Sequence, residues 1–408
     1  MPRRSLQAMI HRNVWQRLPY AWRRRMLFEA TALAAPRPSP SNLPGLPVMV
    51  AGAFRTASGL GASARLSHAA LRQAGTGTGA IDLTAALLQP AELDPPPAET
   101  IADPEQPGTL LLHVNAPLVP LAMLRLGRRA VRNKYVVGYW AWELPKAPAE
   151  WRYGISFVHE IWVPSRFAAE AVRELAGHRP VRVLPHPVSV GKRYAERTAP
   201  DGSRPFTVLT IFNAASSTER KNPMAAIHAF NQAFGDDPKA QLIVKAVNLD
   251  ASPQAAREIR EAIGAAPNMR LIDDLMDNAA LDALYDASDV VISLHRSEGF
   301  GLTIAEAMLR GIPVVATNWS GNVDFLSAER GMPVSYRLIG AADPQETYNH
   351  ANMQWADADV AEAAAALLRL RQEPEFAARI GRQARLYAEA TWSAERYAQA
   401  VRGFLRAD

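Results

Sequence analysis

The chain has 408 residues, of which 48% are apolar and 21% are charged, an ordinary balance for a globular protein of about two domains. The absence of cysteine excludes disulfides, thiol catalysis and cysteine-ligated metal sites. The net charge of +5 is modest, and no run of 18 apolar residues occurs, so we expect no membrane-spanning helix.

The positive charge is concentrated at the start of the chain. Residues 1–35 hold seven arginines and one acidic residue, Glu29, interleaved with aromatic and aliphatic side chains. A helix of this composition can lie on an anionic membrane surface. Two alternatives stay open, an extension whose aromatic residues pack on the body and an organelle transit peptide. We expect a cytoplasmic protein that can contact the inner face of the membrane peripherally through this segment.

A Pro/Ser-rich linker at 35–47 precedes the first regular elements. Apolar runs of strand length then alternate with stretches of helical pattern, as far as about residue 190. Such alternation predicts a parallel sheet covered by helices on both faces. The expected strands cover residues 47–54, 78–83, 109–115, 135–143, 160–165 and 181–188, and the expected helices include 62–73 and 165–177.

A polar, Gly/Pro-bearing segment at 197–205 indicates a hinge, after which the pattern starts again. The predicted fold is therefore α/β, with two doubly wound Rossmann-like domains facing a cleft, where ligands bind at the carboxyl ends of the strands. The strands expected after the hinge are 206–213, 240–247, 268–275, 289–294 and 312–317. The expected divisions are a basic extension with linker at 1–45, an N-terminal domain at 46–200, a C-terminal domain at 201–390 and a terminal helix at 391–408.

The segment HRSEGFGLTIAEAMLRG, residues 295–311, places two glutamates, Glu298 and Glu306, between a predicted strand and helix. Free backbone amides and the helix dipole favour an anion at such a junction, and glycine lets the backbone approach a phosphate closely. A purely structural alternative is a capping box in which Glu306 bonds back to the amide of Thr303. The residues at the junction are Gly299, Phe300, Gly301, Leu302 and Thr303.

The spacing of Glu298 and Glu306 resembles the E-x7-E signature of retaining GT-B glycosyltransferases of family four. The resemblance is strongest over residues 206–326 and reaches back, more weakly, to Val48. It implies transfer of a sugar from a nucleotide diphosphate sugar to a hydroxyl acceptor, a glycan or lipid-linked glycan, with retention. We expect no metal or other cofactor and no nucleic-acid partner.

The resemblance also implies residue roles. Glu306 would bond the ribose hydroxyls, Glu298 would lie beside the donor sugar, and the amides of residues 299–303 would hold the sugar and phosphates. Arg220 and Lys221 match the family's basic pair on the diphosphate, where fixed cations stabilise the charge of a leaving nucleotide diphosphate. The alternative for these two residues is a solvated surface cluster.

Gly59 and Gly61, with Asp82 about 20 residues further on in the next predicted strand, match the pattern of a dinucleotide-binding fingerprint. Four residues separate the strand from Gly59, which is loose for the tight turn that this fingerprint needs. The family resemblance implies instead a glycine loop that faces the donor phosphates.

Further candidates follow strands of the N-terminal half. His113 ends one strand, where it is either a core residue or a catalytic group near the donor sugar. Candidates for the acceptor side, with the alternative of simple burial for the tryptophans, are Asn115, Trp140, Trp142 and Glu143.

A D-x-D string at Asp357 and Asp359 is of the kind that holds a divalent cation in glycosyltransferases of another fold. We expect these acids instead to open a helix, and no metal. Rival functions that stay open are a nucleotide-sugar epimerase or hydrolase on the same fold, a non-catalytic binding or scaffold protein, and, more distantly, a dinucleotide-dependent dehydrogenase.

Overall fold

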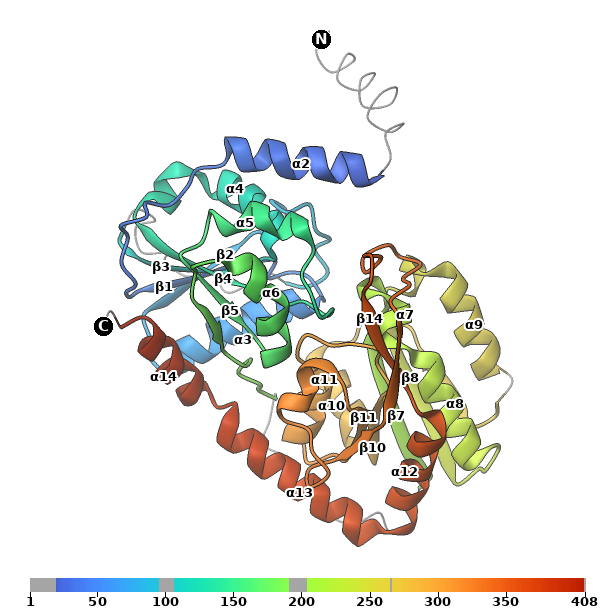
Figure 1. Cartoon of the computed structure of the whole chain (residues 1–408). Coiled ribbons are helices and arrows are strands. Elements are labelled where there is room, and N and C mark those ends of the chain that lie inside the picture. Colours follow the sequence, from blue (N-terminus) through green and yellow to red (C-terminus); the bar gives the residue numbers. More distant parts are fainter. Residues whose placement is uncertain (1–19, 95–105, 191–203, 265, 407–408) are drawn as a thin grey trace.

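The structure, a computed structural model, describes residues 20–94, 106–190, 204–264 and 266–406. These residues form two α/β halves that lie against each other (Figure 1). Most of the predicted hinge at 197–205 and the first 19 residues of the predicted basic extension lie outside the described residues.

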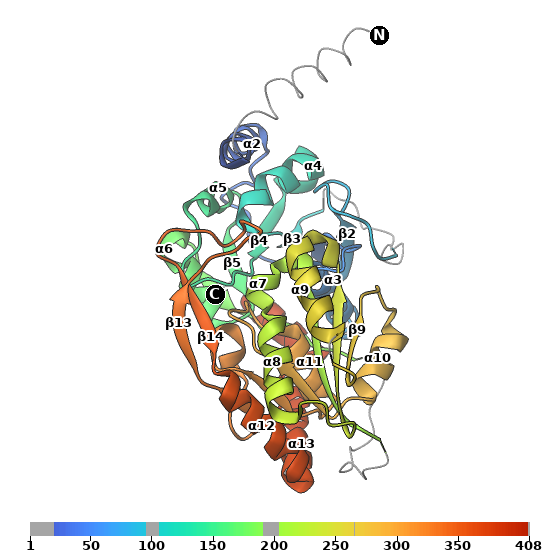
Figure 2. The same cartoon turned by 90° about the vertical axis from the view of Figure 1, so that its right-hand side faces the viewer.

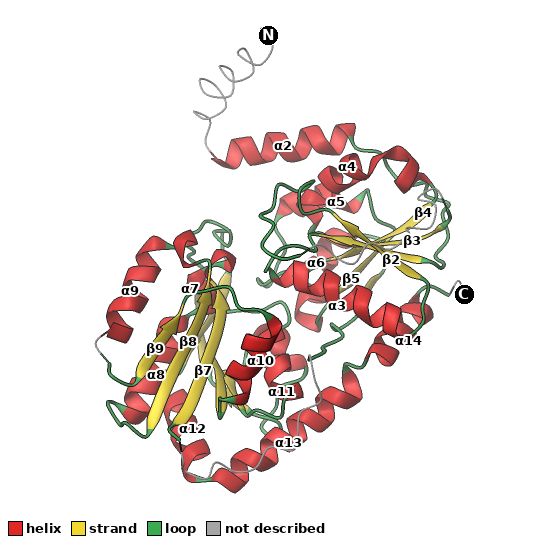
Figure 3. Cartoon of the chain, turned by 180° about the vertical axis from the view of Figure 1, so that it is seen from behind, coloured by secondary structure: helices red, strands yellow, loops and turns green. Residues whose placement is uncertain are grey.

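The N-terminal half is built on a parallel sheet with the strand order β2-β1-β3-β4-β5-β6. Every residue of β1 and β3 is buried, because helices cover both faces of the sheet (Figure 3). The strands are β1 (Val48–Gly52), β2 (Thr78–Asp82), β3 (Gly108–His113), β4 (Lys134–Tyr139), β5 (Glu160–Val163) and β6 (Val181–Val183). The helices are α2 (Tyr20–Ala34), α3 (Gly59–Gln73), α4 (Val119–Arg132), α5 (Arg152–Ile155) and α6 (Arg166–Ala176).

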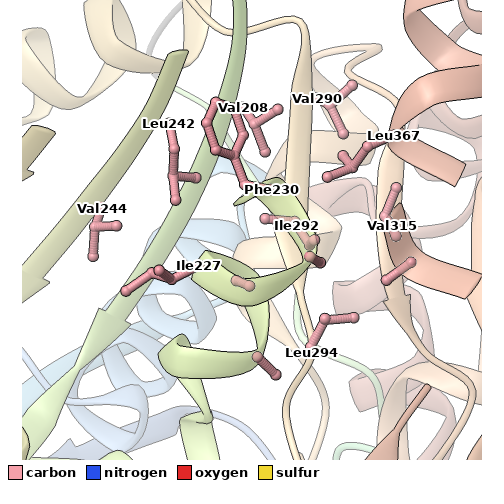
Figure 4. Packing of buried hydrophobic residues seen from close by; sticks show 14 of the residues in the cluster. Val208, Ile227, Phe230, Leu242, Val244, Val290, Ile292, Leu294, Val315 and Leu367 are labelled. Atoms are coloured by element: carbon pink, nitrogen blue, oxygen red, sulfur yellow. The ribbon is translucent and has the colours of Figure 1, made fainter. Parts of the chain in front are cut away.

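The C-terminal half repeats this design with the parallel order β12-β11-β10-β7-β8-β9. Figure 4 shows its core, where Phe230 and Ile227 pack on strand residues such as Val208 and Leu242. The strands are β7 (Phe206–Asn213), β8 (Ala240–Val247), β9 (Met269–Ile272), β10 (Val290–Ser293), β11 (Val314–Thr317) and β12 (Met332–Val334). The helices between and after them are α7 (Thr218–Lys221), α8 (Pro223–Phe234), α9 (Pro253–Gly264), α10 (Asn278–Asp286), α11 (Leu302–Leu309) and α12 (Val360–Gln372). The predicted α/β fold with two Rossmann-like sheets is confirmed.

The last two helices tie the halves together. α13 (Pro374–Thr391) leaves the C-terminal half, and α14 (Ala394–Phe404) packs on α3 of the N-terminal half (Figure 1). Tyr397 donates its hydroxyl to Ser67 Oγ at 2.8 Å, and Val401 is buried in one cluster with Val48 and Leu71. In the described part of the chain, no helix combines the length and apolarity needed to cross a bilayer.

Three local features differ from the predictions. Helix α3 begins at Gly59 rather than near Ala62, because Ser58 accepts a hydrogen bond from the Gly61 amide and starts the helix earlier. Several strands end sooner than predicted, and apolar residues that follow them, such as Phe54, Trp140 and Leu184, are buried in loops instead. An antiparallel hairpin of β13 (Tyr336–Gly340) and β14 (Gln354–Ala358) was not predicted.

Candidate functional site

The carboxyl ends of the two sheets lie against each other. Ser165, after β5, donates its hydroxyl to the carbonyl of Gly299 at 2.6 Å. Asn213, at the end of β7, donates to the carbonyl of Ala57 after β1 at 3.0 Å. Ligands of doubly wound sheets bind at this edge. The loops that carry most of the predicted site residues therefore converge between the halves.

The loop between β10 and α11 is held rigidly by the loop that follows β11. The Gly321 amide donates to the Glu298 carbonyl at 2.9 Å, and the Glu298 amide donates to Ser320 Oγ at 2.7 Å. A Cβ at Gly321 would lie 2.3 Å from the Gly299 carbonyl oxygen, so no side chain fits there. Gly301, which precedes α11, has a φ of 99°, a conformation that favours glycine. The backbone at Glu298 is thus fixed from both sides.

The Glu298 carboxylate lies between two cations. Lys221 donates its ammonium to Glu298, and Arg220 Nη1 lies 3.3 Å from Glu298 Oε1. Both cations belong to α7, which follows β7, the neighbour of β10 in the sheet. The side chains are exposed by only 3% for Arg220, 19% for Lys221 and 12% for Glu298. The structure therefore brings three predicted site residues together and excludes the alternative of a solvated basic cluster.

Two backbone carbonyl oxygens also hold the Arg220 guanidinium in place. Nη1 donates to Ser297 O at 2.7 Å and Nη2 donates to Ser216 O at 2.9 Å. Within the described residues, Arg220 Nε and the buried Ser297 hydroxyl have no hydrogen-bond partner. Buried donors are normally satisfied, so these two donors are suited to a polar ligand. Ser297 was not among the predicted residues, although it directly precedes Glu298.

The charges at this cluster shift pKa values in opposite directions. Burial alone would raise the pKa of Glu298, but Lys221 and Arg220 lower it to about 2. Burial lowers the pKa of Lys221, an effect that the charge of Glu298 opposes. Burial also acts to lower the pKa of Arg220, but the charges around it, Tyr348 and Glu298 first, raise it overall. Glu298 is therefore ionised at neutral pH beside two basic side chains, and the charge of Glu143 also acts on both of them.

Acid should weaken the fold through Glu298. Its pKa falls from 4.5 to about 2 on folding, so its contribution to the free energy of unfolding is present above pH 4.5 and is lost as the pH falls toward 2. A shift of this size corresponds to about 3 kcal/mol. Denaturant titrations at several pH values should show that Glu298→Gln lacks this part of the acid dependence. Parallel curves for both proteins between pH 4.5 and 2 would contradict the expectation.

Glu306 lies in the second turn of α11. Tyr285 of α10 donates its hydroxyl to the Glu306 carboxylate at 3.0 Å. The helix begins at Leu302 with Gly301 as its cap, and no side chain among the described residues caps it. The capping-box alternative for Glu306 is therefore not realised. Burial raises the pKa of Glu306. Nothing in the sequence indicated that Tyr285 would contact Glu306, because the packing of two helices brings these residues together.

The glycines near residue 60 belong to the first turn of α3 and lie next to the loop that contacts the C-terminal half. Asp82 Oδ1 accepts hydrogen bonds from the backbone amides of Phe54 and Thr84, at 3.2 and 3.0 Å. It also accepts the Thr84 hydroxyl at 2.5 Å. Asp82 thus braces the loop after β1, which argues against the dinucleotide alternative.

The two glycines should differ sharply in their tolerance of a side chain. A Cβ at Gly61 would lie 2.4 Å from Thr56 Oγ1 and 2.8 Å from the Ala53 carbonyl, whereas a Cβ at Gly59 meets nothing within 4 Å. We expect Gly61→Ala to lower the free energy of unfolding by about 1–3 kcal/mol. Gly59→Ala is the matched control and should be neutral or stabilising by up to about 1 kcal/mol. Denaturant titration checks both, and equal effects of the two substitutions would disprove the steric argument.

His113 lies in a buried polar cluster at the carboxyl end of β3. Its Nδ1 is 2.7 Å from Ser63 Oγ, which is also 3.2 Å from His186 Nδ1. Tyr139 stacks on His113 with ring centroids 4.5 Å apart, and Phe300 of the β10–α11 loop packs on His186 at 4.9 Å. Burial lowers the pKa of both histidines, that of His186 to about 3, so both are neutral at pH 7.

The buried cluster connects predicted site residues of both halves. Within the described residues His113 Nε2 has no hydrogen-bond partner. Sequence reasoning missed His186, although it also follows a strand and carried the same signal as His113.

The candidates for the acceptor side are mostly covered. Trp140 and Trp142 are buried and both pack on Trp151. Asn115 binds both the amide and the carbonyl of Ala141, at 2.9 and 2.8 Å, and so braces the loop after β4. The alternative of buried tryptophans is what the structure shows, and a role for these residues toward an acceptor stays a prediction.

The D-x-D string has structural partners. Asp359 caps α12 by accepting the Glu362 amide at 2.9 Å, as expected for the start of a helix. Asp357, contrary to the prediction, does not open the helix: it lies in β14 and pairs with Arg337 of the facing strand at 2.9 Å. Both acids lie at the base of the hairpin rather than in the Glu298 cluster.

Two parallel Rossmann-like sheets whose carboxyl ends face each other are the architecture of the GT-B fold. HepE from Anabaena, solved in complex with UDP-glucose, matches with a TM-score of 0.62 and 15% identity over 88% of this chain and 98% of its own. Sucrose-phosphate synthase from Thermosynechococcus elongatus matches with a TM-score of 0.61 and 16% identity over 90% and 98%. At these identities the likeness shows the fold.

Comparison of the sequence with family models identifies the family of the chain. A family model described as "Family 4 Glycosyltransferase in conflict systems" matches residues 163–398, more than half of the chain, and the chain belongs to this family. The predicted resemblance to family four of the GT-B glycosyltransferases is confirmed. The match includes Arg220, Lys221, Glu298 and Glu306.

Curated relatives match over shorter stretches. A trehalose synthase from Rubrobacter xylanophilus is 24% identical over 47% of this chain and 41% of its own length. A D-inositol 3-phosphate glycosyltransferase from Corynebacterium efficiens is 30% identical over 30% of this chain and 29% of its own. The chain thus spans less than half of the length of either relative.

Proposed function

We propose that this glycosyltransferase moves a sugar from a nucleotide diphosphate sugar to a hydroxyl of a glycan or lipid-linked glycan, with retention of the anomeric configuration. The observation that carries the proposal is the convergence of Arg220 and Lys221 on Glu298 beside the amino end of α11. Two fixed basic side chains beside the amino end of a helix suit a diphosphate, and Arg220 Nε is unpartnered within the described residues. The UDP-glucose complex of the structural neighbour HepE supports this donor class.

The chain supplies charge and position in the proposed reaction. The bond from the anomeric carbon to the diphosphate oxygen breaks, and the acceptor oxygen forms a new bond on the same face. The acceptor proton passes to the departing phosphate oxygen. Arg220 and Lys221 stabilise the charge that grows on the leaving group, so the proposed mechanism uses no metal and no other cofactor.

The resemblance to the family suggests roles for the other residues of the site. Glu306 holds the ribose hydroxyls, and His113 and Glu298 face the donor sugar. Residues that hold the donor by backbone contacts are Gly59, Gly61, Gly299, Phe300, Gly301, Leu302 and Thr303. Closure of the two halves over the donor excludes water from the site. Asn115 and Glu143 remain the candidates for the acceptor side, since Trp140 and Trp142 are buried.

Helix α2 supports the proposal of a peripheral contact with the inner face of the membrane in the cytoplasm. Trp22, Met26, Leu27 and Leu33 are exposed on it. Exposed aromatic and aliphatic residues in an arginine-rich segment suit an anionic lipid surface. A lipid-linked acceptor would be presented at that surface.

The test is incubation with a panel of nucleotide diphosphate sugars, with and without simple alkyl glycosides and lipid-linked glycans as acceptors. We expect release of nucleoside diphosphate that depends on the acceptor, and a product whose anomeric proton coupling matches that of the donor. An inverted product would refute retention. Equal consumption of the donor without any acceptor would favour the hydrolase or epimerase. A protein that neither binds nor consumes any donor would be a scaffold.

A further inference from the structure

The hairpin of β13 and β14 carries a long loop, residues 341–353, that belongs to the C-terminal half by sequence but packs on the N-terminal half (Figure 2). Tyr348 of this hairpin loop and Trp355 of β14 are buried in the same hydrophobic cluster as Trp142 and Trp151. The ring centroids of Tyr348 and Trp142 are 5.4 Å apart. The hairpin loop therefore covers the loop after β4.

The hairpin loop is also fixed to the segment that carries the basic pair. Buried Asp343 accepts the Ser217 hydroxyl at 2.8 Å and the amides of Thr347 and Tyr348 at 2.9 and 3.2 Å. Gln345 accepts the Thr218 amide at 2.8 Å. Because Ser217 and Thr218 open α7, the position of the hairpin loop is set relative to Arg220.

Tyr348 connects charged groups of both halves. Its hydroxyl donates to Glu143 Oε2 of the N-terminal half at 3.0 Å. The guanidinium carbon of Arg220 lies 5.3 Å from the centroid of the Tyr348 ring, within range of a cation–π interaction. Arg220 in turn pairs with Glu298. A continuous chain of contacts therefore runs from Glu143 through Tyr348 and Arg220 to the Glu298 carboxylate.

We propose that Tyr348 is a positioning residue that orients the Arg220 guanidinium toward the donor diphosphate, and that its hydrogen bond to Glu143 makes this orientation depend on contact between the halves. The inference rests on the proposed function, since it concerns the same diphosphate site. Its reason is geometric. The Tyr348 ring contacts Arg220, and the hydroxyl of that ring is anchored on the opposite half, so separation of the halves releases the ring.

The test is a double-mutant cycle read as affinity for a nucleoside diphosphate, measured by calorimetry without acceptor. Uridine, guanosine, adenosine and thymidine diphosphates are screened on the wild type, and the tightest binder is the probe. We expect Tyr348→Phe and Glu143→Ala each to weaken affinity by about 3- to 10-fold, the worth of one buried hydrogen bond. The double variant should be no weaker than either single variant, because both remove the same bond.

Two controls separate positioning from a general loss of structure. Glu143→Gln keeps an oxygen that accepts the Tyr348 hydroxyl, so affinity should return to within about 2-fold of the wild type. Tyr336→Phe makes the same substitution on β13, where the ring packs on Trp319, and should leave affinity unchanged. Thermal melts without ligand confirm that the variants fold, and Tyr348→Phe retains the buried ring.

The outcomes distinguish the two proposals. If the wild type binds none of the diphosphates, the proposed function fails and this inference falls with it. If the wild type binds but Tyr348→Phe and Glu143→Ala bind equally well, the inference alone is wrong. Additive losses in the double variant, or no recovery in Glu143→Gln, would show that the two residues act separately and would also overturn it.

Discussion

Lys221→Ala should abolish most donor binding and nearly all transfer. The wild type at a diphosphate concentration 100 times its Kd should gain about 2.7 kcal/mol of stability in a thermal shift. Removal of one charge-assisted contact to phosphate should weaken that affinity by about 10- to 100-fold. Transfer should fall by about 100- to 1,000-fold, since the negative charge on the leaving group is larger in the transition state.

The matched control for Lys221→Ala is Lys239→Ala. Lys239 is exposed and directly precedes β8, so it lies at the amino ends of the strands, opposite the site. It should change neither the thermal shift nor the transfer rate. A diphosphate-induced shift that survives in Lys221→Ala would mean that the ammonium serves only to neutralise Glu298 and does not hold the ligand.

Glu298→Gln should separate donor binding from chemistry. We expect transfer to fall by about 100- to 1,000-fold if the carboxylate stabilises the reacting sugar. The affinity for nucleoside diphosphate should hold or rise, because loss of the anion leaves Arg220 and Lys221 free to attract the diphosphate. Calorimetry and steady-state transfer assays on the same preparation measure both effects.

The same variant should destabilise the free protein. Removal of one partner from a buried pair leaves charge without compensation, at a cost of about 3 kcal/mol. Glu389→Gln is the control, since its pair with Arg385 is an exposed helical contact expected to contribute no more than about 0.5 kcal/mol. A 10-fold loss of diphosphate affinity in Glu298→Gln would instead assign Glu298 the role of ordering the two cations.

Much of the fold was predictable because its signals are local. Strands of a parallel sheet are buried on both faces and appear as continuous apolar runs, as β3 and β7 do. The position of Glu298 was predictable for the same reason, since a loop that follows a strand must lie at the carboxyl edge of the sheet. The pairing of Lys221 with Glu298 was not predicted, because the two residues meet only through the neighbouring positions of β7 and β10 in the sheet.

Other contacts had no sequence signal because distant segments make them. Tyr348 lies in an irregular loop that neither helical nor strand periodicity describes, and its bond to Glu143 joins residues 205 positions apart. The hairpin was missed because β13 is a short, mostly exposed strand. The structural roles of Asp82 and Asp359 depend on which backbone amides lie nearby, so their motifs were ambiguous without coordinates.

The sequence by itself determined the class of fold, the two-half organisation and the local unit that places Glu298 and Glu306 at a strand–helix junction, because periodicity and spacing act over a few residues. Only the tertiary structure decided which charges meet and which residues are covered. Contacts between the halves bury Trp142 under the hairpin loop. Contacts within the C-terminal half bring Arg220 against Tyr348 and leave the Arg220 Nε without a partner among the described residues. These outcomes depend on how segments distant in the sequence pack against each other, which no local pattern specifies.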